Sequence, residues 1–202
     1  MNKRSRIRAS GGVVAATAVA LVTVQGSGAD AGSDRTPVAE HTTVCVGTRP
    51  AHGLPGRESF PLRVTIYADK RGTTRYKNVF TGVSVDERGN AVNVYRIPSK
   101  ASKASKAFDA DVCGHAIKGV KVRIHDTDVT QRQTYALVDR VGHAKHRWDG
   151  RFKLYTVGPD VDGYVIFGVD RPAKAEPVIK KAFGEFWARH IKVEHSGVPT
   201  LD

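Results

Sequence analysis

Hydrophobic and polar residues alternate in two stretches of the chain that share one layout. The first runs from Phe80 to Ile97 and turns at Gly89-Asn90, and the second runs from Leu154 to Val169 and turns at Pro159 to Gly163. Alternation with a period of two predicts strands with one buried face, and Gly, Asn, Asp or Pro between two such strands favours a hairpin. The pattern therefore predicts two β-hairpins.

Each predicted hairpin is followed by a helical pattern and then by one more alternating stretch. Apolar residues recur three or four positions apart after the first hairpin and again after the second, which is the spacing of one helix face. The stretches GVKVRIHDT and HIKVEHS then alternate as strands do. The helical positions are Ala101, Ala104, Phe108 and Val112 in the first copy, and Ile179, Phe183 and Phe186 in the second.

These elements predict an α+β fold made of tandem ββαβ units, hairpin then helix then strand. The units cover about residues 79–126 and 154–196, and residues 130–148 predict a linker helix between them. Val92 then matches Val165, and Val120-Lys121-Val122 matches Ile191-Lys192-Val193. We expect thin sheets covered on one face by helices, since a single unit leaves its other face bare. The alternative is a chance similarity of two amphipathic segments.

The N-terminal part of the chain divides into three predicted segments. Residues 1–31 carry a basic start, an apolar stretch and Ala29-Asp30-Ala31, which is the pattern of a signal peptide. Residues 32–60 are rich in Gly, Pro and small polar residues and predict a flexible arm. Alternation at Leu62, Val64 and Ile66 predicts a strand at the start of the 61–202 domain.

The signal peptide predicts a secreted protein without a membrane span once the peptide is removed; an uncleaved membrane anchor is the alternative. Its apolar stretch is shorter than the roughly 20 residues that cross a bilayer. The whole signal peptide, residues 1–31, holds four basic residues and one acidic residue. Its removal lowers the formal net charge of the chain from +12 by 3, to +9. A charge of that sign favours acidic partners.

Cys45 and Cys113 are the only two cysteines of the chain. In an oxidising compartment one even pair predicts a single disulfide, here across 68 positions. Two free thiols are the alternative.

A search for catalytic and metal-binding patterns indicates a protein that is not an enzyme and needs no cofactor or metal. The chain has no G-x-S-x-G, H-E-x-x-H, Walker loop or C-x-x-C. Asp160 and Asp162 flank a turn, where aspartate is favoured for local hydrogen bonding. The opposing hypothesis is a hydrolase that uses histidines or a bound metal, with the histidines placed at His125, His143, His146 and His195.

A basic stripe at Lys100, Lys103 and Lys106 suits a solvated helix face or, as a second hypothesis, an anionic or cell-wall polymer. Aromatic residues are not interleaved with the stripe, which argues against specific nucleic-acid binding.

The first hairpin also resembles the prosegments of secreted bacterial chymotrypsin-fold proteases, the alpha-lytic protease and streptogrisin group. In that family a Val-Asp pair precedes a short polar turn and Asn-x-Val-x-Val follows. Here the matching residues are Val85-Asp86, Glu87 to Asn90, and Val92-Asn93-Val94. The resemblance covers about residues 79–197, but the second hairpin has Gly158-Pro159-Asp160 in place of Val-Asp.

The resemblance implies a folding template and tight inhibitor of an exported serine protease. The sequence holds no His-Asp-Ser protease module and no G-D-S-G, so we expect a non-catalytic module that acts in trans. In the family a sheet docks on the protease and the C-terminal tail enters the cleft. The corresponding tail is Val198, Pro199, Thr200 and Leu201, and the strands expected to pair with the partner at a sheet edge hold Val120, Val122, Ile124, Ile191 and Val193.

Overall fold

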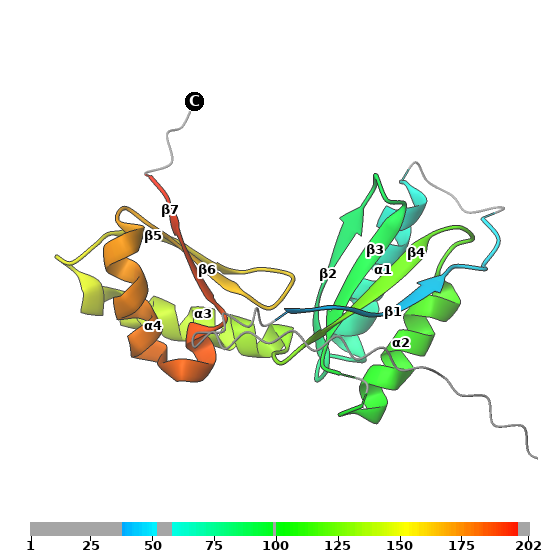
Figure 1. The fold of residues 1–202 in the computed structure, drawn as a ribbon, viewed down its shortest axis with the longest axis horizontal. Coiled ribbons are helices and arrows are strands. Elements are labelled where there is room, and N and C mark those ends of the chain that lie inside the picture. The colour runs from blue at the N-terminus through cyan, green and yellow to red at the C-terminus, as the bar shows by residue number, and fades with distance from the viewer. Residues whose placement is uncertain (1–37, 52–57, 99, 198–202) are drawn as a thin grey trace, which may run out of the picture. The chain divides into compact units, whose positions relative to one another are not determined.

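The computed structural model describes residues 38–51, 58–98 and 100–197 and confirms the α+β class. The predicted signal peptide and the tail at 198–202 lie outside these residues. The described elements form two open sheets, each packed against two helices (Figure 1). In chain order they are β1 (Val38–Val46), α1 (Phe60–Thr74), β2 (Phe80–Asp86), β3 (Ala91–Arg96), α2 (Lys103–His115), β4 (Lys121–Thr127), α3 (Gln131–Ala144), η1 (Lys145–Trp148), β5 (Leu154–Pro159), β6 (Val165–Val169), α4 (Pro172–Ala188) and β7 (Ile191–His195).

The first sheet has four strands in the order β1-β4-β3-β2. The β2–β3 hairpin is antiparallel, β3 and β4 are parallel, and β1 runs antiparallel to β4. Parallel neighbours need a crossover connection, and α2 supplies it. Helices α1 and α2 share one hydrophobic core with the sheet, so they cover the same face. Its members include Val64 of α1, Phe108 of α2, Val94 of β3 and Ile124 of β4.

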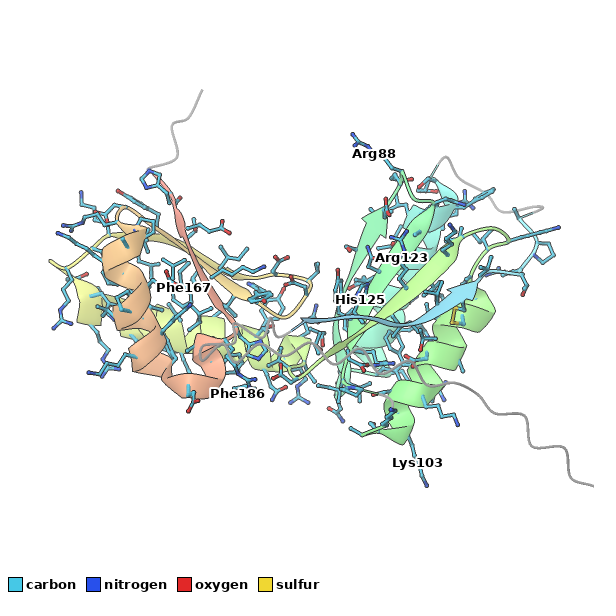
Figure 2. All side chains as sticks on the ribbon, in the orientation of Figure 1. Arg88, Lys103, Arg123, His125, Phe167 and Phe186 are labelled. Atoms are coloured by element: carbon cyan, nitrogen blue, oxygen red, sulfur yellow. A yellow bond between two sulfur atoms is a disulfide. The ribbon has the colours of Figure 1, made fainter. Side chains whose placement is uncertain are left out.

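The second sheet has three strands in the order β5-β6-β7. The β5–β6 hairpin is antiparallel, and α4 crosses over between the parallel strands β6 and β7. Phe167 of β6 is buried in the core that this sheet forms with Leu137 of α3 and Ile179 of α4 (Figure 2). Both ββαβ units are therefore present as predicted, and the linker helix is present as α3.

The strand register corrects the residue correspondence between the two units. Val92 pairs with Val122 in the first sheet, whereas Val165 pairs with Ile191 in the second. If Val92 and Val165 are equivalent residues of the two units, the residue of the first unit that is equivalent to Ile191 is Val122 and not Val120. The two predicted matches are therefore out of register with each other by two residues. The sequence pattern does not reveal such a shift, because both third strands alternate and a shift of two preserves the buried face.

The predicted strand around residues 60–72 is wrong, because this segment forms helix α1. The Ser59 side chain accepts a hydrogen bond from Leu62 N–H at the N-terminus of the helix. The buried residues Pro61, Val64, Ala68 and Gly72 are spaced three or four apart, so one helix face is buried. Gly72 lets α1 approach β2 closely, since a Cβ there would lie 2.3 Å from the Phe80 ring.

The segment predicted as an irregular arm, residues 32–60, contains strand β1 at Val38–Val46. The predicted disulfide between Cys45 and Cys113 is present, with the two Cα atoms 6.0 Å apart, and it ties β1 to α2. No helix among the described residues has the length and apolar character needed to cross a lipid bilayer.

Candidate functional site

One of the two strands predicted to pair with a partner is not a sheet edge. Strand β4 lies between β1 and β3, so neighbours occupy both of its hydrogen-bonding sides. Val120, Val122 and Ile124 are completely buried in the first core. The prediction failed here because β1 comes from the distant N-terminal segment, which carried no clear strand pattern. These three residues are core residues of the first sheet.

The other predicted strand, β7, is an edge strand of the sheet that the structure describes. His190 C=O accepts a hydrogen bond from Val165 N–H at 2.7 Å, and Ser196 N–H donates one to Val169 C=O at 2.9 Å. Alternate residues of a parallel strand bond to a given neighbour. The even-numbered residues of β7 thus face β6, and the backbone groups of Ile191, Val193 and His195 point toward the free side.

The side chains of β7 divide between a buried face and an open face. Ile191 is buried and Val193 is half-buried, and both contact the second core. On the open face the Lys192 ammonium lies 3.6 Å from the centre of the Tyr164 ring and 3.5 Å from an Asp162 oxygen. Burial raises the pKa of the Asp162 carboxyl above its ordinary value. Because Glu194 and His195 are exposed, the C-terminal half of β7 is open to a partner.

The tail residues predicted to enter a protease cleft, Val198, Pro199, Thr200 and Leu201, lie outside the described residues. Strand β7 ends at His195, and two residues separate it from them along the chain. Their role stays a prediction.

The residues that carry the prosegment resemblance stabilise the first hairpin. The Asp86 carboxylate accepts a hydrogen bond from Gly89 N–H and forms an ion pair with Arg123, both at 2.8 Å. The Gly89 hydrogen bond, followed by the Arg123 one, lowers the pKa of Asp86. Asn90 adopts a positive φ of 46° and its side-chain amide donates to Gly119 C=O. The resemblance therefore rests on turn chemistry.

The histidines considered for a hydrolase are spread over both sheets and the linker helix. His125 stacks on Tyr95 on β3, with ring centres 4.8 Å apart, whereas His143 and His146 are exposed on α3 and η1. Among the described residues no three His, Cys, Asp or Glu side chains gather closely enough to hold a metal ion. The Asp160 and Asp162 carboxylates accept backbone N–H groups within their own turn.

A buried histidine, His190, contacts both the β5–β6 turn and the segment that joins β4 to α3. Its Nδ1 lies 3.2 Å from Gly163 C=O, and its Nε2 lies 2.8 Å from an Asp128 oxygen, off hydrogen-bond geometry. Burial lowers the pKa of His190 below its ordinary value of 6.5, although Asp128 opposes the shift. The neutral imidazole is the form that the folded chain favours.

We expect the free energy of unfolding to decrease as the pH falls from 7 to 5. The unfolded chain binds a proton at His190 near pH 6.5, whereas the folded chain binds it only at lower pH, so acid favours unfolding. Urea unfolding at both pH values measures the loss, with His190→Asn as the control that does not titrate. An equal loss in the variant would assign the pH dependence to other groups.

The sequence analysis missed a basic groove in the second half of the chain. The run HAKHRWDGRFK, residues 143–153, places six Lys, Arg or His residues around Trp148, and this composition could have identified it. The basic stripe predicted at Lys100, Lys103 and Lys106 does not line this groove. Lys103 and Lys106 project from α2, and Lys103 points away from the sheet (Figure 2).

Comparisons with protein-family models, with curated proteins and with solved structures found no match to this chain.

Proposed function

We propose that the chain is an exported, non-catalytic module that binds an exported serine protease by adding a strand to β7. The single observation that supports this proposal is the free edge of β7, where the backbone groups of Ile191, Val193 and His195 face away from β6. Backbone hydrogen bonds at such an edge supply affinity in strand addition, and the alternate side chains supply specificity. The signal-peptide pattern and the resemblance to protease prosegments supply the compartment and the kind of partner.

The proposal is tested by mixing purified residues 32–202 with a panel of exported chymotrypsin-fold proteases and following residual activity over time. We expect stoichiometric inhibition of at least one protease without cleavage of the module. If every protease ignores or digests the folded module, the proposal is wrong, and binding to cell-wall polymers becomes the function to test.

Val193→Pro tests the β7 edge directly. Proline removes a backbone N–H that points away from β6, and proline is tolerated on strand edges for that reason. We expect the inhibition constant to rise about tenfold, the cost of one or two backbone hydrogen bonds. Val193→Ala is the matched control, since it removes packing and keeps the N–H. Equal effects of the two variants would contradict pairing at β7.

Deletion of residues 198–202 separates the edge from the tail. Full retained potency would discard the role of Val198 to Leu201 while leaving the β7 proposal intact. A further loss on top of Val193→Pro assigns independent contacts to both segments.

A further inference from the structure

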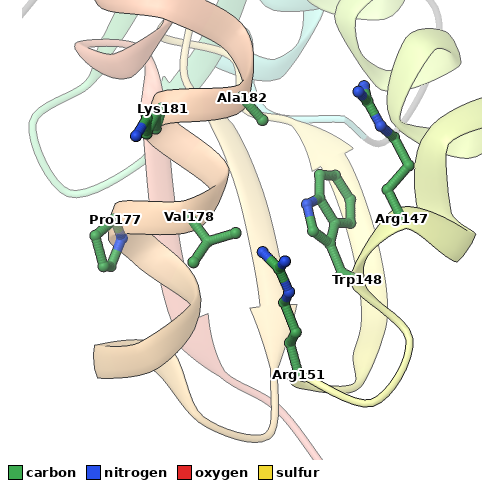
Figure 3. Close-up of a pocket in the computed structure, with 7 residues that line it drawn as sticks. All are labelled: Arg147, Trp148, Arg151, Pro177, Val178, Lys181 and Ala182. Atoms are coloured by element: carbon green, nitrogen blue, oxygen red, sulfur yellow. The ribbon is translucent and has the colours of Figure 1, made fainter.

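A groove of about 570 Å³ lies between η1 with its following turn and helix α4 (Figure 3). Arg147, Trp148 and Arg151 line one side, and Pro177, Val178, Lys181 and Ala182 line the other. This volume falls within the range of sites that hold a small ligand or a few residues of a peptide, roughly 300–1,000 Å³.

The floor of the groove is apolar and fixed in place. Trp148 is 4% exposed and contacts Phe152 and Phe183, with ring centres 5.9 and 6.1 Å apart. Figure 3 shows the indole nitrogen of Trp148 on the side of the ring that faces Val178. The Trp148 indole N–H forms no hydrogen bond among the described residues. Its nitrogen is not one of their fully buried atoms that lack a partner, so it can donate to a ligand.

The rim of the groove is cationic and has no acidic member. Among the described residues, Arg147, Arg151 and Lys181 take part in none of the ion pairs, whereas their neighbour Lys180 pairs with Glu176 at 2.6 Å. Figure 3 shows the Arg151 guanidinium between Val178 and Trp148. An apolar floor beneath cations without partners is complementary to a ligand that carries both an apolar group and a negative charge.

We infer that this groove binds an acidic peptide segment of a partner protein, with an aliphatic side chain against Trp148 and Val178 and a neighbouring carboxylate held by Arg151. Arginine suits a carboxylate because its planar fork donates two hydrogen bonds. This site is separate from the β7 edge and does not depend on the protease proposal.

Two other anionic partners fit the groove less well. A polyanion needs a track of cations along its backbone, and here the cations surround one apolar recess. A bilayer surface needs exposed apolar side chains that insert into it, and none of the exposed large hydrophobic residues lines the groove.

The test uses the peptide acetyl-Glu-Leu-Glu-amide and the two indole N–H signals of the chain, which has only Trp148 and Trp187. Trp187→Phe assigns the signals. We expect the Trp148 signal to shift and saturate, and Arg151→Gln to weaken binding about tenfold, as for one lost charge-assisted contact. Lys103→Gln is the matched control, because it removes the same charge from an exposed site on α2.

Two further peptides separate the parts of the inference. Acetyl-Gln-Leu-Gln-amide lacks the charge and acetyl-Glu-Gly-Glu-amide lacks the apolar group, and each is expected to bind about tenfold more weakly. An unshifted Trp148 signal, equal binding of the neutral peptide, or binding of polyphosphate with no binding of the acidic peptide would overturn the inference.

Discussion

Replacing Arg96 with alanine is expected to lower the free energy of unfolding by about 3–5 kcal/mol, the cost of breaking a buried ion pair from one side. Arg96 is 1% exposed. Its Nε and Nη2 each lie 2.8 Å from a different oxygen of Asp109, and its Nη1 donates to Asp126. The alanine variant leaves the carboxylates of Asp109 on α2 and Asp126 on β4 without the cation that they share.

Urea unfolding measures this loss, and two variants control for it. Arg96→Lys keeps the charge but loses the two-pronged contact with Asp109, so a smaller loss is expected. Arg88→Ala removes an exposed arginine from the β2–β3 turn (Figure 2), where a change within about 0.5 kcal/mol is expected. A similar small change for Arg96→Ala would show that the ion-pair cluster does not hold the first unit together.

Replacing Cys45 and Cys113 together with serine is expected to cost about 4 kcal/mol in the chain-entropy description of disulfides. The bond closes a loop across 68 positions and fixes β1, whose sheet contacts are with β4 alone. Without the disulfide, β1 loses its covalent link to α2 and is held to the sheet by its pairing with β4.

Amide hydrogen exchange locates the effect of that double variant. The amides of β1 and β4 are expected to exchange faster, while those of β6 in the second sheet keep their rates. Unchanged stability, or equal loss of protection in both sheets, would contradict the assigned role of the disulfide.

The repeated unit could be predicted from sequence because its signals are local. The apolar residues recur every two residues in the hairpins and in the third strand of each unit, and every three to four residues in α2, α3 and α4. Because the same order of patterns occurs twice, each copy supports the interpretation of the other. The linker was predicted as one helix over residues 130–148, and it forms α3 (Gln131–Ala144) followed by the short η1 (Lys145–Trp148). Leu137 and Val141 of α3 are buried.

The errors arose where local patterns were ambiguous or where distant segments decided the outcome. Leu62, Val64 and Ile66 alternate as in a strand, yet the Ser59 cap and the spacing of Val64, Ala68 and Gly72 favour a helix. Strand β1 is short of apolar signal. It pairs with the distant strand β4, and its disulfide partner Cys113 on α2 lies 68 positions away.

The pairing of β1 with β4 also determines which of the two predicted edge strands has a free edge among the described residues. Strands β4 and β7 occupy equivalent places in the two units, and no feature within either strand shows that β1 covers one of them. The sequence therefore identified both strands, and only the sheet order separates β7 as an edge. The basic run at residues 143–153 marks only one side of the groove beside Trp148. The other side comes from α4, about 30 residues further along the chain, so the groove itself depends on the crossover of α4.

The central claim, strand addition at β7, is tested most directly by amide hydrogen exchange of the module alone and in complex with an inhibited protease. The account predicts that the amides of Ile191, Val193 and His195 become protected on binding, while Lys192 and Glu194, which already face β6, change little. Tight inhibition with unchanged exchange at the three odd-numbered amides would contradict it.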